Sequence, residues 1–276
     1  MRFTKMQGIG NDYIYIDGSK EQIDDIPKLS IELSDRHFGI GGDGIIMVNP
    51  SDKADCAMDI YNADGSRAQM CGNGIRCVAK YAKDHGMVDG NVVRIETLSG
   101  IKTVNILENK GNSATVRVDM GAPMLSPPDM PADFEGDRII NETLEVGKVK
   151  YKVTCVSMGN PHCVIFMEDD INSLEIERLG PLFENHERFP ERINTEFVNV
   201  LDDSTLSMRV WERGSCETMA CGTGACAVLV AAVLNDKAKR EAAIRLKGGS
   251  LDILWDEKDG HVYMTGEARK VFDGEI

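Results

Sequence analysis

The residues with the clearest chemical potential are two cysteines, Cys71 and Cys221, each of which begins a Cys-Gly-x-Gly sequence. Each sequence follows a turn and precedes a segment that predicts a helix, so each thiol is expected at a helix N-terminus. The free N–H groups and the dipole of a helix favour negative charge at that end. We therefore expect the pKa of both thiols to be lowered, and the adjacent glycines to admit an anion such as a carboxylate.

Two equivalent thiols suit the inversion of a carbon centre that bears a carboxylate. One group must remove a proton from one face of the carbon, and a second group must return a proton to the opposite face. The two helix ends would bind the carboxylate and stabilise the negative charge that develops as the proton leaves. Because two negative charges at short distance are costly, we expect one thiolate and one thiol that titrate as a pair.

The two cysteines belong to an internal repeat. Segment 61–74 resembles segment 211–224, since both run from an aromatic residue through a Gly-containing turn to Cys-Gly-x-Gly, and the cysteines are 150 residues apart. A second pair of similar segments contains Asn11 and Asn160, which are 149 residues apart. Two matches at nearly the same offset indicate a duplicated unit.

The elements that must position these residues are mostly strands, because alternating or β-branched segments dominate both halves. The predicted strands are 13–17, 44–48, 57–61, 92–97, 101–107 and 114–120, then 150–156, 163–167, 197–200, 206–211, 242–246 and 250–255. The predicted helices are 27–36, 74–85, 172–183 and 224–234. The last is apolar on every side, which indicates a helix enclosed by a sheet. We expect an α+β fold of two pseudo-symmetric halves, each a barrel-like, mostly antiparallel curved sheet around a central helix.

Composition narrows the possible functions. The formal net charge is −14, which makes binding to nucleic-acid phosphates unfavourable, and the longest apolar run, 225–234, is too short to cross a bilayer. With no apolar N-terminal stretch, we expect a soluble, cytoplasmic protein. The eight cysteines include no CxxC pair, so we expect most of them to be small buried residues. No Walker A sequence or metal-spaced histidine cluster occurs, and we expect neither a cofactor nor a metal.

Taken together, these segments resemble the diaminopimelate epimerase family, whose members interconvert LL- and meso-diaminopimelate without a cofactor. The matching stretches begin at Met6 and end at Ala268, so the resemblance covers nearly the whole chain. They include Met6–Asp12, Tyr61–Ser66, Gln69–Cys77, Ser157–Cys163, His186–Asn194, Glu212–Gly214, Ala220–Ala227, Gly248–Leu251 and Thr265–Ala268.

The resemblance implies a role for each matched residue. Cys71 and Cys221 would be the proton acceptor and donor, and His162 and Glu212 would tune the pKa of the thiols. The residues that would bind substrate are Asn11, Asn62, Gly72, Asn73, Asn160, Asn194, Glu212, Arg213, Gly222 and Thr223. Within this set Gly72, Asn73, Gly222 and Thr223 would contact the reacting carboxylate, and Glu212 would bind the distal ammonium group.

The resemblance also implies where the domain boundaries lie, how the protein assembles and which pathway it serves. It divides the chain into residues 1–120 with 267–276, carrying Cys71, and residues 121–266, carrying Cys221. A homodimer that acts on a small amino acid and supplies lysine and peptidoglycan precursors is expected. Two positions depart from the family: Gly44 stands where some members have a glutamine that touches substrate, and Cys216 stands where many have Gly or Ala. We expect the Cys216 side chain to be buried.

Three other functions are also compatible with the paired cysteines. A proline or hydroxyproline racemase-like enzyme shares the paired thiols, although its members typically have His where this chain has Asn73. A thiol-redox protein would use Cys71 and Cys221 as a reversible disulfide, and oxidation that joined the two thiols would stop proton transfer. A catalytically inactive amino-acid-binding module would need neither thiol.

Overall fold

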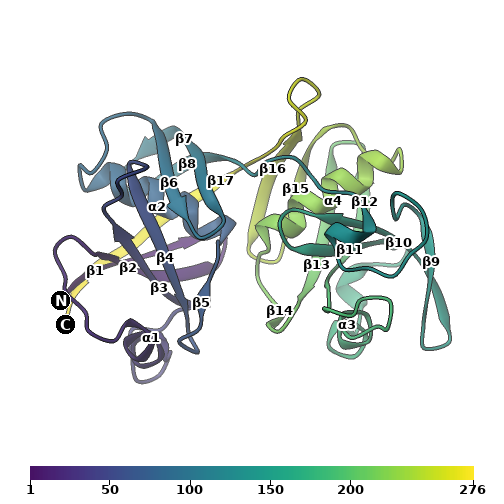
Figure 1. Ribbon diagram of the computed structural model, residues 1–276, viewed down its shortest axis with the longest axis horizontal. Coiled ribbons are helices and arrows are strands. Elements are labelled where there is room, and N and C mark those ends of the chain that lie inside the picture. Colours follow the sequence, from purple (N-terminus) through teal and green to yellow (C-terminus); the bar gives the residue numbers. More distant parts are fainter. The chain divides into compact units, whose positions relative to one another are not determined.

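The computed structural model describes residues 1–276, which form two compact units (Figure 1). Unit 1 contains Met1–Asp119 and Thr265–Ile276, and unit 2 contains Met120–Met264. No helix is long and apolar enough to cross a membrane.

Unit 1 is a closed sheet in which hydrogen bonding runs from β1 through β2, β3, β4, β6, β7 and β8 to β17, and β17 pairs with β1. The pairs β2–β3 and β4–β6 are parallel, and the other register-defined pairs are antiparallel. The strand bounds are β1 Arg2–Gly8, β2 Asn11–Asp17, β3 Gly44–Asn49, β4 Cys56–Asn62, β5 Arg67–Ala68, β6 Val92–Thr97, β7 Gly100–Lys110, β8 Ser113–Asp119 and β17 Val262–Glu275.

Unit 1 contains two helices, of which one is buried inside the sheet and the other packs against two of its strands. Helix α2, Gly72–Asp84, packs against strands around the sheet, and every residue from Gly72 to Ala82 is buried (Figure 1). This enclosed helix includes two cations: Arg76 donates to Gly72 O and Asn73 Oδ1, and Lys80 pairs with Asp84 at 2.9 Å. Helix α1, Ile26–Ser34, packs against β3 and β4.

Unit 2 repeats the same order of pairings. From β10 through β11, β12, β13 and β15 to β16, antiparallel and parallel pairs alternate just as they do from β1 to β7. Strand β9 adds an antiparallel partner to β10. The strand bounds are β9 Glu142–Val146, β10 Val149–Ser157, β11 Pro161–Phe166, β12 Asn194–Asp202, β13 Thr205–Glu212, β14 Cys216–Glu217, β15 Glu241–Leu246 and β16 Gly249–Trp255. The expected α+β fold of two related, strand-rich halves is confirmed.

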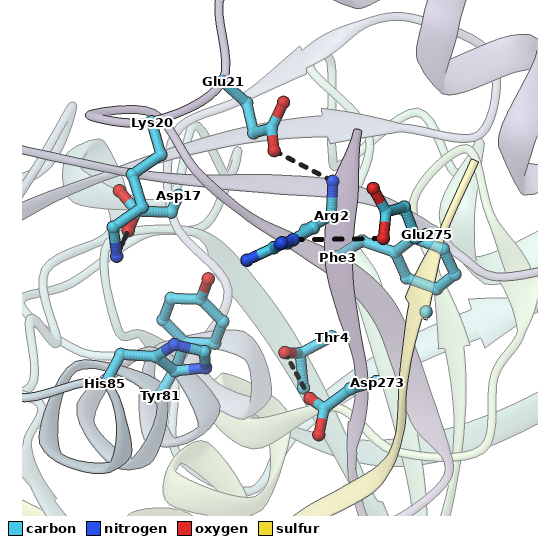
Figure 2. Close-up of a pocket in the computed structure, with 11 residues that line it drawn as sticks. Arg2, Phe3, Thr4, Asp17, Lys20, Glu21, Tyr81, His85, Asp273 and Glu275 are labelled. Atoms are coloured by element: carbon cyan, nitrogen blue, oxygen red, sulfur yellow. Dashed lines mark hydrogen bonds and ion pairs between the residues drawn. The ribbon is translucent and has the colours of Figure 1, made fainter.

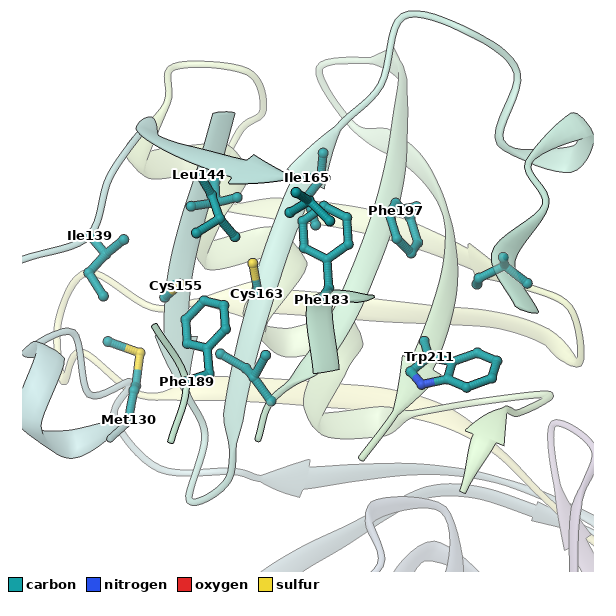
Figure 3. Packing of buried hydrophobic residues seen from close by; sticks show 14 of the residues in the cluster. Met130, Ile139, Leu144, Cys155, Cys163, Ile165, Phe183, Phe189, Phe197 and Trp211 are labelled. Carbon is teal, nitrogen blue, oxygen red and sulfur yellow. The ribbon is translucent and has the colours of Figure 1, made fainter. Parts of the chain in front are cut away.

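Helix α4, Gly222–Leu234, is the counterpart of α2 and packs against strands β10, β11, β12, β15 and β16. Its residues are buried from Gly222 to Ala232 except Thr223, as its uniform apolarity predicts. Helix α3, Ile176–Glu184, packs against β12 and β13, where Phe183 meets Phe197 edge-to-face at 5.5 Å (Figure 3). Both halves therefore hold one helix inside the sheet and pack a second against the β3–β4 or β12–β13 pair.

One predicted helix is wrong in detail. The segment 172–183 contains a 3₁₀ turn at Ile171–Ser173, extended backbone at Leu174, and α3 from Ile176. The carbonyls of Ile171 and Leu174 both accept from Arg209 of β13, so a long-range contact interrupts the local helical pattern. Strands β1, β5, β9, β14 and β17 were not predicted. The partners of β17, β1 and β8, are distant in the sequence, whereas β1 and β9 also pair locally with β2 and β10.

The contact between α3 and Trp211 gives a stability test. A Cβ built on Gly180 would lie 2.3 Å from Trp211 Cδ2, so Gly180→Ala should cost about 1–3 kcal/mol by overpacking. Denaturant unfolding measures the change. Gly90→Ala is the control, since its Cβ would meet no atom closer than 3.7 Å. Equal stability of the two variants would contradict the packing.

Candidate active site

Cys71 and Cys221 occupy the same local position in the two units. Each is the N-cap residue of its enclosed helix, α2 or α4, with extended backbone. The sulfur of Cys71 accepts the Gly74 N–H at 3.3 Å, and the sulfur of Cys221 accepts the Gly224 N–H at 3.4 Å. A thiol thus takes the role that Ser or Asp usually has at a helix start. Each cysteine therefore lies at a helix N-terminus, as its sequence predicts.

Glycine at the third helical position leaves room for the side chains around each helix start. A Cβ on Gly74 would lie 2.8 Å from Ile46 and 2.9 Å from Met58. A Cβ on Gly224 would lie 2.7 Å from Glu196 Oε1 and 3.3 Å from the Cys221 sulfur. In both units a side chain at this position would push into the core or against the thiol environment, so the second glycine of Cys-Gly-x-Gly has a steric reason.

In unit 1, Asn11 is the polar neighbour of Cys71. The Cys71 S–H donates to Asn11 Oδ1 at 3.1 Å, while Asn11 Nδ2 donates to Asp43 Oδ2 at 2.7 Å. Asp43 also accepts the Asp12 N–H at 3.0 Å and pairs with Arg36 at 2.9 Å. The carboxylate of Asp43 therefore fixes which end of the Asn11 amide faces the thiol.

The other predicted residues of unit 1 have mainly structural contacts. Asn73 is buried, and its amide oxygen accepts from Arg76 at 3.1 Å. Asn62 donates from Nδ2 to Ser66 Oγ at 3.0 Å within the turn that follows β4. Gly72 is the first residue of α2, and its carbonyl also accepts from Arg76.

In unit 2, a chain of hydrogen bonds lies beside Cys221. His162 Nδ1 is 2.6 Å from Glu196 Oε1, and His162 Nε2 is 3.1 Å from Asn160 Oδ1. His162 and Glu196 are fully buried. Parallel pairing of β11 with β12 positions both, since His162 pairs with Asn194 and Val164 pairs with Glu196.

Glu212 lies at the end of β13 and accepts a hydrogen bond from Thr218 Oγ1. Burial raises the pKa of Glu212, and this effect exceeds the lowering by Thr218 and by the charge of His162. The Thr223 hydroxyl is 3.5 Å from the sulfur of Cys221, and Gly222 is the first residue of α4.

Asn194 and Arg213 lie together at the adjoining strand ends. Asn194 is buried; its Nδ2 donates to Pro161 O at 2.8 Å, and its Oδ1 accepts the Arg213 N–H at 2.9 Å. The Arg213 guanidinium donates to Glu191 O at 3.0 Å. Unit 2 therefore brings together Asn160, His162, Asn194, Glu212, Arg213, Gly222, Thr223 and Cys221 around the ends of β11, β12 and β13 and the start of α4.

The expected lowering of the pKa is wrong for Cys221. Burial raises the pKa of this thiol well above its usual value, and the nearby carboxylates of Glu212 and Glu196 raise it further. The hydrogen bonds from Thr223 and Gly224 lower it, but they are smaller effects. Desolvation and two neighbouring acids outweigh the helix N-terminus, so Cys221 is held as a thiol.

Gly44 and Cys216 are the two positions at which the sequence departs from the family. Gly44 has a φ of +152°, and a Cβ there would lie 2.0 Å from Tyr61 O, so this backbone leaves no room for the glutamine of other members. Cys216 is exposed and has a φ of +61°, a conformation that glycine adopts without strain. The expectation that Cys216 is buried is wrong, because it begins the two-residue strand β14 directly after a turn and its side chain is exposed.

Asp43 and Glu196 are the residues that sequence reasoning missed. Asp43 lies among glycines just before β3, and Glu196 lies within the apolar strand β12. A charged residue at a buried position of a strand is itself a signal, because such a charge is rarely buried without a partner.

The same unit contains the only group of side chains whose spacing suits a metal ion. Ligand atoms of His162, Glu196 and Cys221 all lie within 4.8 Å of one another. However, both ring nitrogens of His162 already have oxygen partners, so coordination would have to displace one of these hydrogen bonds.

A separate cavity of about 490 Å³ lies in unit 1 (Figure 2). It is lined by Tyr81 and His85, whose rings stack at 4.0 Å near the C-terminal end of α2, together with residues of β1 and β17. Cys71 caps the opposite end of the same helix, so this cavity is not part of the thiol environment.

Thiol reactivity tests the electrostatics of unit 2. At pH 7.5 the exposed Cys216 should react with iodoacetamide at least about tenfold faster than Cys221, because the thiolate is the reactive form. Glu212→Gln removes one charge that raises the pKa of Cys221 and should speed its alkylation. Peptide mass spectrometry measures both sites, with Cys77, whose pKa burial raises to about 11, as the unreactive reference. Slower labelling of Cys221 in the Gln variant would contradict the charge effect.

Known proteins are similar to this chain along its whole length. The sequence profile of the diaminopimelate epimerase family matches residues 3–126 and 154–271. A protein of Acetivibrio thermocellus named diaminopimelate epimerase is 51% identical over 276 residues, which cover 100% of this chain and 98% of that protein. A protein of Agathobacter rectalis with the same name is 52% identical over 283 residues, covering 100% and 99%.

Solved structures with the same fold are more distant. A probable proline racemase from Agrobacterium radiobacter has a TM-score of 0.69 at 14% identity and covers 100% of this chain and 92% of its own. A phenazine biosynthesis protein of the PhzF family from Bacillus anthracis has a TM-score of 0.67 at 14% identity, covering 100% and 98%. At such identity the likeness concerns the fold alone, whereas half-identical relatives share the family. This chain belongs to the diaminopimelate epimerase family.

Proposed function

We propose that this chain converts LL-2,6-diaminopimelate to meso-diaminopimelate by proton transfer between Cys71 and Cys221, without a cofactor. The observation that carries the proposal is the matched position of the two thiols, each at the N-cap of an enclosed helix. Full-length relatives that are about half identical and carry this name support the choice of substrate.

The chemistry follows from the two thiols. In one direction a thiolate removes the proton from Cα, and the electron pair of the C–H bond passes toward the carboxylate. The other thiol then gives its proton to the opposite face of the carbon and becomes the thiolate. Because the pKa of Cys221 is raised, Cys221 begins as the proton donor and Cys71 as the base in the first of the two directions. The reverse reaction exchanges the roles.

The helix starts supply the charge stabilisation. The first N–H groups of α2, at Gly72 and Asn73, and of α4, at Gly222 and Thr223, lie at the positive end of each helix dipole. These groups would donate to the substrate carboxylate, whose charge grows as the proton leaves. Asn11, hydrogen-bonded to Cys71, would contact the same centre.

The distal amino-acid end of the substrate needs both acceptors and donors. Glu212 would accept the ammonium group, whose charge offsets the cost of ionising a buried carboxyl. Arg213 would bind the carboxylate, and Asn62, Asn160 and Asn194 would complete the contacts. Such directional groups favour a substrate with two amino-acid ends over proline. We further propose a cytoplasmic homodimer that serves lysine and peptidoglycan precursor synthesis.

Hydrogen exchange in deuterium oxide tests this function. Wild-type protein should place deuterium at Cα of diaminopimelate and should leave L-proline unlabelled. Cys71→Ala and Cys221→Ala should each lose turnover by at least about 100-fold, because each removes one of the two proton carriers. Cys216→Ala is the matched control and should keep turnover, since this exposed thiol has no role in the reaction.

The rivals have distinct outcomes in the same assay. Label in proline alone would favour a racemase of cyclic amino acids. Full turnover of a folded Cys71→Ala protein would contradict two-thiol chemistry. Loss of turnover on oxidation that joins Cys71 to Cys221, with recovery on reduction, agrees with the proposal, whereas full activity of that oxidised protein contradicts it.

A further inference from the structure

Glu184 ends helix α3 and is a buried carboxylate that joins three separate groups. Its Oε1 accepts the Gly214 N–H at 2.9 Å and a guanidinium N–H of Arg192 at 3.1 Å. Its Oε2 accepts the indole N–H of Trp211 at 2.7 Å. Hydrogen bonds to a carboxylate are about twice as strong as neutral ones, and a buried group that loses its partner is costly. This one side chain therefore holds all three donors in place.

The carboxylate fixes both ends of the short segment that leads from β13 into its turn. Trp211 lies in the last part of β13, and Gly214, with a φ of +80°, lies in the turn. Only Glu212 and Arg213 lie between these two fixed points. Their side chains are the acceptor and the donor that would bind the ammonium and the carboxylate of the distal end. The bonds of Glu184 therefore restrict the backbone from which both groups project.

Unit 1 lacks this carboxylate at the repeated position. At the offset of 150 residues that separates the paired cysteines, Glu184 corresponds to Ser34, the last residue of α1. The Ser34 hydroxyl is buried and has no hydrogen-bond partner. The corresponding turn of unit 1 carries Asn62 and Ala63 instead of the charged pair, and Ser30 of α1 donates to the Asn62 carbonyl at 2.8 Å. The carboxylate therefore occurs only in the unit whose turn carries an acid and a guanidinium.

We propose that Glu184 is a positioning residue that fixes the backbone of Glu212 and Arg213, so that unit 2 selects the distal amino-acid end of the substrate. Because Glu212 accepts and Arg213 donates, the two side chains match an ammonium group and a carboxylate carried by one carbon. Glu184 acts through these two residues. The inference rests on the proposed function for the identity of the ligand, whereas the hydrogen bonds of Glu184 do not depend on it.

Kinetics of Glu184→Gln in the full-length protein test the positioning role. Glutamine keeps the size of the side chain but replaces one acceptor oxygen by an NH2 group, which cannot accept from an N–H donor. The variant should raise KM for diaminopimelate about tenfold and change kcat less than about threefold, because the loss concerns groups that bind the distal end. A purely structural role would instead reduce the amount of folded enzyme, which lowers the apparent kcat and leaves KM unchanged.

Glu175→Gln is the matched control. Glu175 lies at the other end of α3, where its exposed carboxylate pairs with Arg178 at 2.8 Å, so this variant should keep the wild-type KM. A wild-type KM in Glu184→Gln, or an equal rise in both variants, would overturn the proposal.

Two further measurements keep the proposal testable if Glu184→Gln fails to fold. Trp211→Phe removes only the bond to Oε2 and should raise KM about threefold; an unchanged KM would overturn the proposal. In ¹⁵N NMR of the wild-type protein, the indole hydrogen of Trp211 should exchange with solvent at least about tenfold more slowly than that of Trp255, which donates to Gly260 O at 3.1 Å. Equal exchange would contradict the carboxylate bond. Absence of deuterium incorporation into diaminopimelate by the wild-type protein would instead refute the proposed function and leave the NMR result valid.

Discussion

The interaction on which the rest of the structure depends is the hydrogen bond from the third helical N–H to a cysteine sulfur. It ties a reactive atom to the start of a helix that a curved sheet encloses, so the thiol cannot move without disturbing the core. The strand order places the neighbouring polar groups at the ends of β2 and β3 in one unit and of β11, β12 and β13 in the other. The order of antiparallel and parallel strand pairings that positions these groups is the same in both units.

Within that shared plan the two thiols have different surroundings. Cys71 is half-buried and donates to a neutral amide, whereas Cys221 is almost fully buried beside two acidic side chains. Two copies of one unit have therefore kept the geometry and changed the electrostatics. An enzyme that moves a proton in both directions benefits from unequal partners, because equal ones would repel each other as thiolates or lack a base as thiols.

Local signals in the sequence were sufficient for the fold class, the repeat and the two capping cysteines, because glycine, cysteine and apolar periodicity act within a few residues of each other. The pKa of Cys221 could not be obtained this way, since desolvation depends on strands that arrive from distant parts of the chain. Glu196 was missed for the same reason: it belongs to no motif, and its partner His162 is 34 residues away. The break before α3 arises from Arg209, which no local pattern reveals.

Strand β17 has a consequence for how the protein is made. Its later part pairs with β1 at the register Arg2 to Glu275, so unit 1 lacks one wall of its sheet until residues 265–276 have been synthesised. The strands and helices of unit 2 all lie between 120 and 264 and can assemble earlier. On the ribosome, α2 and its cysteine therefore remain accessible to chaperones and oxidants longer than α4, and the unit that is translated first is the one that closes last.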